Sequence, residues 1–198
     1  ECIGWSESNA VIYANSVLGA RTSKIPDYLD LFVAMTGRAP YCGTYADSGR
    51  QAQRIIELAG IPEYVDDGFW PLLGWVAGKH APDRIPLLRG LENLQAGTDA
   101  MKAVCAAFGS TSGAPMLHIA GHTPEAGMPA SPDADRVTID RQMLADAWRQ
   151  LNSGGGNIDL VAIGSPHVSL EELRLVDAAL DGRHCHADVD LIVTVGRD

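Results

Sequence analysis

The chain of 198 residues is long enough to bury a sizeable core, and its 46% hydrophobic and 20% charged residues are typical of a folded domain rather than a disordered or fibrous chain. No apolar run approaches the roughly 20 residues that span a bilayer, which argues against a membrane-embedded protein. A net charge of -10 repels polyanions and argues against nucleic-acid binding.

The four cysteines, Cys2, Cys42, Cys105 and Cys185, lie far apart and form no Cys-x-x-Cys pair. A chain of this size does not depend on disulfides for its stability, so we expect four reduced and unpaired thiols. The cysteine pattern therefore favours a reducing, cytoplasmic setting.

The first eighty residues are predicted to be mainly helical. Apolar residues at helical spacing, most of them followed by glycine, predict helices over 6–18, 27–36 and 51–59. Residues 67–78 are apolar on most sides and predict a buried helix interrupted near Pro71 and Gly74. Residues 39–45 between these helices are β-prone.

Strands and helices alternate in the rest of the chain. Strands are predicted at 84–90, 115–121, 159–165 and 189–196, and helices at 98–108, 140–151 and 169–180. Ser169 and Glu172 form a capping-box pattern at the start of the last helix. Near-continuous apolar strands between helices indicate an α/β protein with a layered sheet of mostly parallel strands and helices on both faces.

Three segments place polar residues where such sheets bind ligands, at helix starts and at the carboxyl ends of strands. The first is the helix start at Ser6 to Asn9. A capped helix explains those residues, whereas Asn15 and Ser16 further along are too polar for an ordinary buried face and favour a function.

The second segment, Gly109 to Gly113, predicts a loop whose amides and hydroxyls hold a carboxylate and face the same cavity as Ser6 and Asn15. A plain connector explains it equally well. His118, inside an apolar strand, is typical of a core histidine.

The third segment is Gly164 to His167, where a buried strand is predicted to end before the helix at Ser169. A simple turn explains this arrangement, but a histidine at the carboxyl end of a strand is also where catalytic groups gather. Both interpretations stay open.

Four long segments in order, residues 5–22, 26–45, 110–126 and 160–173, resemble the aconitase X family of hydro-lyases. The resemblance covers nearly the whole chain. It implies a large α/β domain, an iron-sulfur cluster or iron centre held by cysteines, and a smaller swivelling domain as partner. It also implies dehydration of a small hydroxy acid, and residues 22–31 and 36–43 are more similar to the cis-3-hydroxy-L-proline branch than to the mevalonate 5-phosphate branch.

The family resemblance also implies which residues line the site. His167 and Ser165 would be catalytic, and the substrate would be bound by Ser6, Glu7, Asn15, Ser16, Arg21, Thr111 and Ser112. Arg21 follows a helix stop at Gly19, so its planar guanidinium can swing back and bind a carboxylate in a bidentate manner.

This chain also departs from the family pattern. Many relatives have Gly-Cys-Pro-His where Ser165 stands here, and none of the four cysteines matches a cluster ligand. We therefore interpret residues 1–198 as a single α/β domain, the central part of a large domain without its swivelling domain, with unknown metal ligands and a catalytic base elsewhere.

Two other function classes remain open. The chain could be a non-catalytic binding or assembly subunit that keeps the fold without the cluster. It could also be a metal-dependent hydrolase that uses His118, His122 and Glu125.

Overall fold

The computed structural model describes residues 8–196 of the chain. They form two compact units, which meet in sequence between Leu151 and Asn152 and are described separately here. Within residues 8–196, no helix combines the length and the apolar character that crossing a membrane requires.

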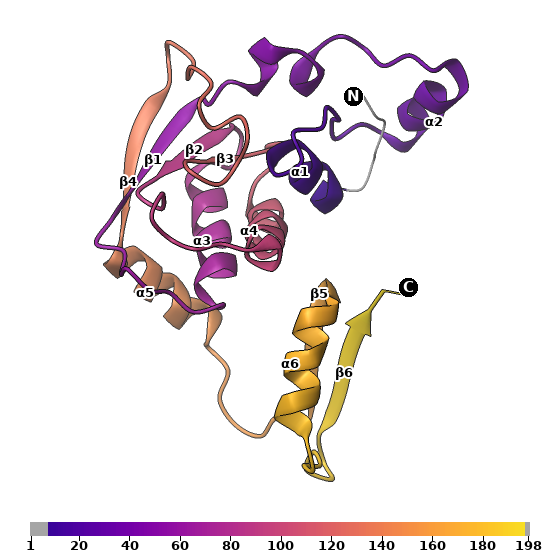
Figure 1. Cartoon of the computed structure of the whole chain (residues 1–198), viewed down its shortest axis with the longest axis vertical. Coiled ribbons are helices and arrows are strands. Elements are labelled where there is room, and N and C mark those ends of the chain that lie inside the picture. The colour runs from indigo at the N-terminus through magenta and orange to yellow at the C-terminus, as the bar shows by residue number, and fades with distance from the viewer. Residues whose placement is uncertain (1–7, 197–198) are drawn as a thin grey trace. The chain divides into compact units, whose positions relative to one another are not determined.

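The first unit begins with the two predicted helices, α1 (Ser8–Ser16) and α2 (Asp27–Thr36) (Figure 1). Helix α1 packs against a later helix, α4 (Thr98–Thr111), and buries apolar side chains such as Ile12. Helix α2 has no buried residue, and it ends where Gly37 adopts φ 65° and donates its N–H to the carbonyl of Val33. Glycine reaches this left-handed conformation without a steric penalty, so the predicted helix stop is confirmed.

Four parallel strands form the sheet of this unit in the order β3-β2-β1-β4. Their bounds are Arg54–Ala59 for β1, Pro86–Arg89 for β2, His118–Ile119 for β3 and Asp135–Asp140 for β4. The parallel pairing confirms the α/β class. It also confirms the strands predicted at 84–90 and 115–121, although β3 is only two residues long.

Two predictions for the sheet region were wrong. Residues 51–59 were expected to be a helix, but residues 54–59 form β1, because the buried β-branched pair Ile55 and Ile56 lies between two neighbouring strands. Residues 39–45 form no strand, and the chain makes two short 3-10 helices instead, η1 (Gly43–Tyr45) and η2 (Asp47–Arg50). Strand β4 was not anticipated, because only Ile139 on it is fully buried.

Helices α3 (Phe69–His80), α4 (Thr98–Thr111) and α5 (Arg141–Leu151) confirm three predicted helices. No interruption occurs in α3. Pro71 lies in its first turn, where a missing N–H costs no helical hydrogen bond, and Gly74 lets the backbone of α4 approach closely.

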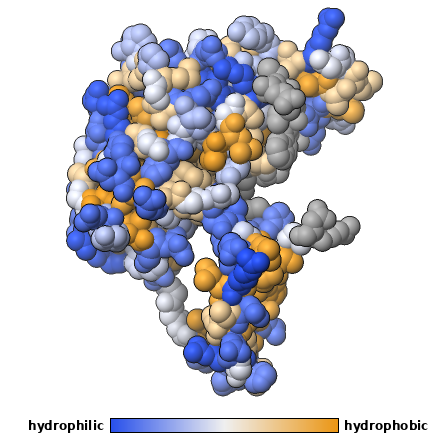
Figure 2. All heavy atoms as spheres, in the orientation of Figure 1, coloured by the Kyte–Doolittle hydropathy of each residue, from blue (hydrophilic) through white to orange (hydrophobic). Residues whose placement is uncertain are grey.

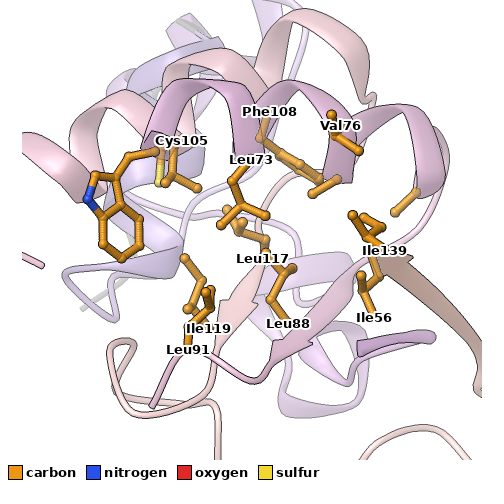
Figure 3. Close-up of a cluster of buried hydrophobic side chains, with 14 of the residues drawn as sticks. Ile56, Leu73, Val76, Leu88, Leu91, Cys105, Phe108, Leu117, Ile119 and Ile139 are labelled. Atoms are coloured by element: carbon orange, nitrogen blue, oxygen red, sulfur yellow. The ribbon is translucent and has the colours of Figure 1, made fainter. Parts of the chain in front are cut away.

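One face of the sheet carries the main hydrophobic core (Figure 3). Ile56, Leu88 and Ile119 lie on neighbouring strands in one row and meet side chains from α3 and α4 such as Leu73 and Phe108. This layer fixes the positions of the strands and therefore of the segments that follow them.

The opposite face of the sheet carries the row of Ile55, Leu87 and His118, which the parallel register brings side by side. All three are buried. The ring nitrogen Nε2 of His118 lies 2.7 Å from the carbonyl oxygen of Arg50, so the end of η2 is bonded to this face.

The second unit is a parallel βαβ arrangement of β5 (Leu160–Val168), α6 (Leu170–Leu180) and β6 (Asp190–Val195). The predicted capping box of Ser169 and Glu172 is confirmed. The prediction that β5 is buried was wrong. Leu160 and Val161 are exposed, because a two-stranded sheet with one helix has few neighbours to cover them. Figure 2 shows apolar residues at the surface of this unit.

Candidate functional site

A cluster of charged side chains lies in the first unit, and the buried guanidinium of Arg50 is at its centre. Arg50 has an exposed fraction of 0% and contacts Glu125 Oε2 through Nε at 2.6 Å and through Nη2 at 2.5 Å. Its Nη1 donates to the carbonyl of Thr44 at 3.0 Å, and its Nη2 donates to the carbonyl of Asn15 at 3.0 Å. A buried cation needs such a set of acceptors, so Arg50 ties three distant segments together.

Asn15 is the second buried polar residue of the cluster. Its Nδ2 donates to the carbonyl oxygens of Thr22 at 2.9 Å and Pro115 at 3.1 Å, and its Oδ1 accepts the N–H of Thr22 at 3.0 Å. Its neighbour Ser16 accepts the N–H of Leu117 on Oγ. The polar groups of Asn15 and Ser16 thus join the end of α1 to the segment before β3. Substrate binding by these two residues stays a prediction.

Arg21 lies at the more open side of the cluster. Gly19, at φ 64°, turns the chain after α1, and the Arg21 side chain keeps an exposed fraction of 25%. Its Nη1 donates to the carbonyl of Tyr45 at 3.1 Å, and Nη2 is ion-paired with Asp47 and lies 3.7 Å from Glu125 Oε1. Two cations and two anions therefore meet at one place.

Two buried polar atoms near this cluster lack a hydrogen-bond partner within residues 8–196, Nδ1 of His118 and Oγ1 of Thr22. Burial lowers the pKa of His118, and it outweighs the hydrogen bond to Arg50 and the nearby Glu125 carboxylate, which act in the opposite direction. His118 is thus a neutral core histidine at neutral pH, in agreement with the sequence interpretation.

The lowered pKa of His118 makes stability depend on pH. Below about pH 6.5 the unfolded chain takes up a proton on this imidazole before the folded chain does, so the free energy of unfolding should fall as pH decreases from that value toward the folded pKa. We expect His118→Gln to lose less stability between pH 7.5 and pH 5.5 than the wild type, as measured by urea unfolding at each pH. Burial also lowers the pKa of His80, so His80→Gln should change the pH dependence in the same direction. Equal pH dependence in the wild type and His118→Gln would contradict the assignment.

The expected carboxylate-binding loop at 109–113 is wrong. Helix α4 continues to Thr111, and the hydroxyls of Thr111 and Ser112 find acceptors in α3 and at the residue that follows it. Thr111 Oγ1 donates to the carbonyl of Trp75 at 2.9 Å, and Ser112 Oγ donates to the carbonyl of Ala81 at 2.6 Å. These bonds join α4 to α3, so a role of Thr111 and Ser112 in substrate binding stays a prediction without a loop to support it.

The other predicted residues lie elsewhere. Ser6 and Glu7 fall outside the described residues. Ser165 and His167 belong to β5 of the second unit, where the His167 side chain is exposed. Their catalytic role stays a prediction.

The described residues do not fit an iron centre or cluster. Among residues 8–196, no group of three His, Cys, Asp or Glu side chains is arranged to hold a metal ion. Burial raises the pKa of the Cys105 thiol to about 12, which disfavours the thiolate that binds metals, and Cys42 and Cys185 are exposed in different units.

The trio proposed for a metal-dependent hydrolase is not a metal site either. Nε2 of His122 lies 2.9 Å from the carbonyl oxygen of Leu91, and Glu125 is held by Arg50. His118 is bonded to the Arg50 carbonyl. All three side chains therefore have hydrogen-bond or ion-pair partners within the protein instead of converging on a metal ion.

Sequence reasoning missed Arg50 and Asp47. Both stand in the polar stretch Asp47–Arg50 beside glycine and serine, which is typical of a solvated loop. Only the fold shows that one end of this short helix is buried and the other is exposed, so no local pattern could have separated the two residues.

Comparison with known proteins connects this chain to a family. Residues 1–48 match the model of the aconitase X first domain, and residues 52–149 match the model of the aconitase X second domain. A solved structure of aconitase X from Thermococcus kodakaraensis, described as the holo-form, superposes with a TM-score of 0.84 and 31% identity over 98% of this chain and 50% of that chain.

Curated relatives align over the full length of the chain. The cis-3-hydroxy-L-proline dehydratases of Pseudomonas aeruginosa and Hypocrea jecorina are 45% and 43% identical over all of this chain, which spans 35% and 34% of their own lengths. The phosphomevalonate dehydratase large subunit of Methanocaldococcus jannaschii is 32% identical over 96% of this chain, which spans 48% of that protein. From its two matched domains and these relatives, the chain belongs to the aconitase X family.

Proposed function

We propose that this chain is part of a hydro-lyase that dehydrates cis-3-hydroxy-L-proline. The observation that carries the proposal is the difference in identity between two groups of relatives. The two cis-3-hydroxy-L-proline dehydratases are 45% and 43% identical to the chain, against 30% to 35% for phosphomevalonate dehydratase large subunits. Mevalonate 5-phosphate is the alternative substrate, supported by the high coverage of that second group.

The reaction removes the α-proton and expels the β-hydroxyl as water, which leaves an enamine that tautomerises to a cyclic imine. Hydroxide is a poor leaving group, and negative charge develops on the carboxylate side as the α-proton leaves. A cation held at the carboxylate stabilises that charge. We assign this task to Arg21, and we propose that the catalytic base lies elsewhere in the complete enzyme.

The contacts of Arg21 support the assignment. Its planar guanidinium is only partly exposed, and the carbonyl of Tyr45 holds one nitrogen in place. Its partner Asp47 has an exposed fraction of 77%, so this ion pair is worth little and a substrate carboxylate can replace it.

We expect Arg21→Lys in the complete enzyme to lower kcat/KM, because lysine cannot form two parallel hydrogen bonds to a carboxylate. The loss should correspond to about 1.5 to 3 kcal/mol of transition-state stabilisation. The melting temperature should change little. Steady-state kinetics with cis-3-hydroxy-L-proline and with mevalonate 5-phosphate check the effect, and wild-type kcat/KM on whichever compound is turned over would defeat the assignment.

We also propose that the complete enzyme contains an iron-sulfur cluster or iron centre and a small swivelling domain or subunit. The description of relatives as large subunits, and the share of their length that this chain spans, support a further domain or subunit. Because the described residues do not fit the metal group, we place no step of the reaction on it. His167 and Ser165 stay proposed as catalytic residues. A reducing cytoplasm is the proposed location, which would suit the exposed thiols of Cys42 and Cys185.

The deciding experiment supplies both substrates to the complete, metal-replete protein. Dehydration of cis-3-hydroxy-L-proline should give a cyclic imine that borohydride reduces to proline, which amino-acid analysis quantifies. Turnover of mevalonate 5-phosphate alone would favour the alternative dehydratase, and turnover of neither would favour a non-catalytic subunit. Both of these outcomes contradict the proposal.

A further inference from the structure

We propose that Glu125 binds the ammonium group of an amino-acid substrate next to Arg21, and so determines which substrate class the enzyme accepts. The inference rests on the proposed function, because it assumes that Arg21 holds the substrate carboxylate. It adds a residue that recognises the second charge of a zwitterion.

The two oxygens of Glu125 have different surroundings. Oε2 is clamped by Nε and Nη2 of the fully buried Arg50 at 2.6 and 2.5 Å. Oε1 accepts no hydrogen bond from residues 8–196, and the Glu125 side chain keeps an exposed fraction of 20%. Arg50 therefore fixes the carboxylate while one oxygen stays available to a ligand.

The available oxygen lies next to the proposed carboxylate site. Glu125 Oε1 is 3.7 Å from Nη2 of Arg21, which is too long for a hydrogen bond and short enough for electrostatic attraction. In an α-amino acid the carboxylate and the ammonium are attached to the same carbon. A neighbouring cation and anion at this spacing match those two groups with opposite charge.

The balance of charge favours the same class of ligand. The cluster contains two cations, Arg21 and Arg50, and two anions, Asp47 and Glu125, and it is thus neutral. Cyclic imino acids are neutral zwitterions, whereas mevalonate 5-phosphate carries a carboxylate and a phosphate. Glu125 would attract the ammonium of the first and repel the anionic groups of the second.

The buried atoms without partners are consistent with a polar ligand here. His118 Nδ1 and Thr22 Oγ1 are the two buried side-chain atoms without a hydrogen bond within the described range. Both residues contact the cluster, since Thr22 is bonded to Asn15 and His118 to the carbonyl of Arg50. Polar atoms left unpaired inside a protein are costly unless a water or a ligand completes them.

The test measures binding rather than turnover. L-Proline and tetrahydrofuran-2-carboxylate of matching configuration have the same ring and carboxylate, but only proline has an ammonium. Titration calorimetry on the complete protein should show that Glu125→Gln weakens proline binding at least about tenfold and leaves tetrahydrofuran-2-carboxylate binding unchanged. Arg21→Lys should weaken the binding of both ligands.

Controls separate this role from a structural one. Asp146→Asn makes the same acid-to-amide change at an exposed ion pair remote in sequence from the cluster, and it should alter neither affinity. If Glu125→Gln does not fold, the wild type still decides, because equal affinity for the two ligands overturns the proposal. A wild type that prefers proline but does not dehydrate cis-3-hydroxy-L-proline would refute the proposed function and leave the assignment of Glu125 standing.

Discussion

Replacing Arg50 with Met should lower the free energy of unfolding by about 3 to 5 kcal/mol, the usual cost of removing one partner from a buried ion pair. The methionine side chain has a similar length but no hydrogen-bond donor. The Glu125 carboxylate would lose its clamp, and the carbonyl oxygens of Thr44 and Asn15 would lose their Arg50 donors. Urea unfolding followed by tryptophan fluorescence measures the change.

The matched control is Arg149→Met, which breaks an exposed ion pair with Asp146. The Arg149 side chain has an exposed fraction of 64%, so we expect a change below about 1 kcal/mol. The double variant Arg50→Met with Glu125→Met should recover part of the loss, because it leaves no unpaired buried charge. A single-variant effect as small as that of Arg149→Met would show that Arg50 does not stabilise the fold.

Gly74→Ala should lower the free energy of unfolding by about 2 to 3 kcal/mol, which is the second large effect we expect. Alanine favours a helix over glycine by about 1 kcal/mol, so propensity alone predicts stabilisation. A Cβ atom at this position of α3 would overlap the carbonyl oxygen of Val104 in α4, and a backbone atom cannot turn aside as a side chain can. The two helices must move apart and disturb the core that they share, so the cost of overpacking outweighs the gain in helix propensity.

Gly127→Ala provides the control for Gly74→Ala, because a Cβ there has no neighbour within 4 Å and the residue does not need a positive φ. The free energy of unfolding of this variant should stay within about 0.5 kcal/mol of the wild-type value. Thermal unfolding of the two variants side by side gives the comparison. A Gly74→Ala protein more stable than the wild type would mean that α3 and α4 adjust to the added methyl group at no cost.

Periodicity and glycine stops were enough to predict α1 and α2, and periodicity alone predicted α4 and α5, although α4 runs past Gly109 to Thr111. They failed at β1, where two adjacent isoleucines fit a helix and a strand equally well until neighbouring strands are known. They also failed at β4, an edge strand with few buried side chains. Short-range patterns carry no information about which strand lies beside which.

The candidate site was predicted only in part, for a related reason. Arg21 could be selected from its family motif and the preceding turn, but its partners Asp47 and Glu125 lie 26 and 104 residues further along the chain. The importance of Arg50 depends wholly on burial by tertiary packing. Thr111 and Ser112, which looked like ligands for an anion, use their hydroxyls between two helices.

The Arg50 cluster also bears on how this protein can evolve. Arg50 falls in the gap between the two matched family domains, with Asn15 and Thr44 in the first and Glu125 in the second. Recombination that exchanged either domain for an unrelated one would strand a buried charge. The two matched domains therefore depend on each other physically, since the partners of this one buried cation are divided between them.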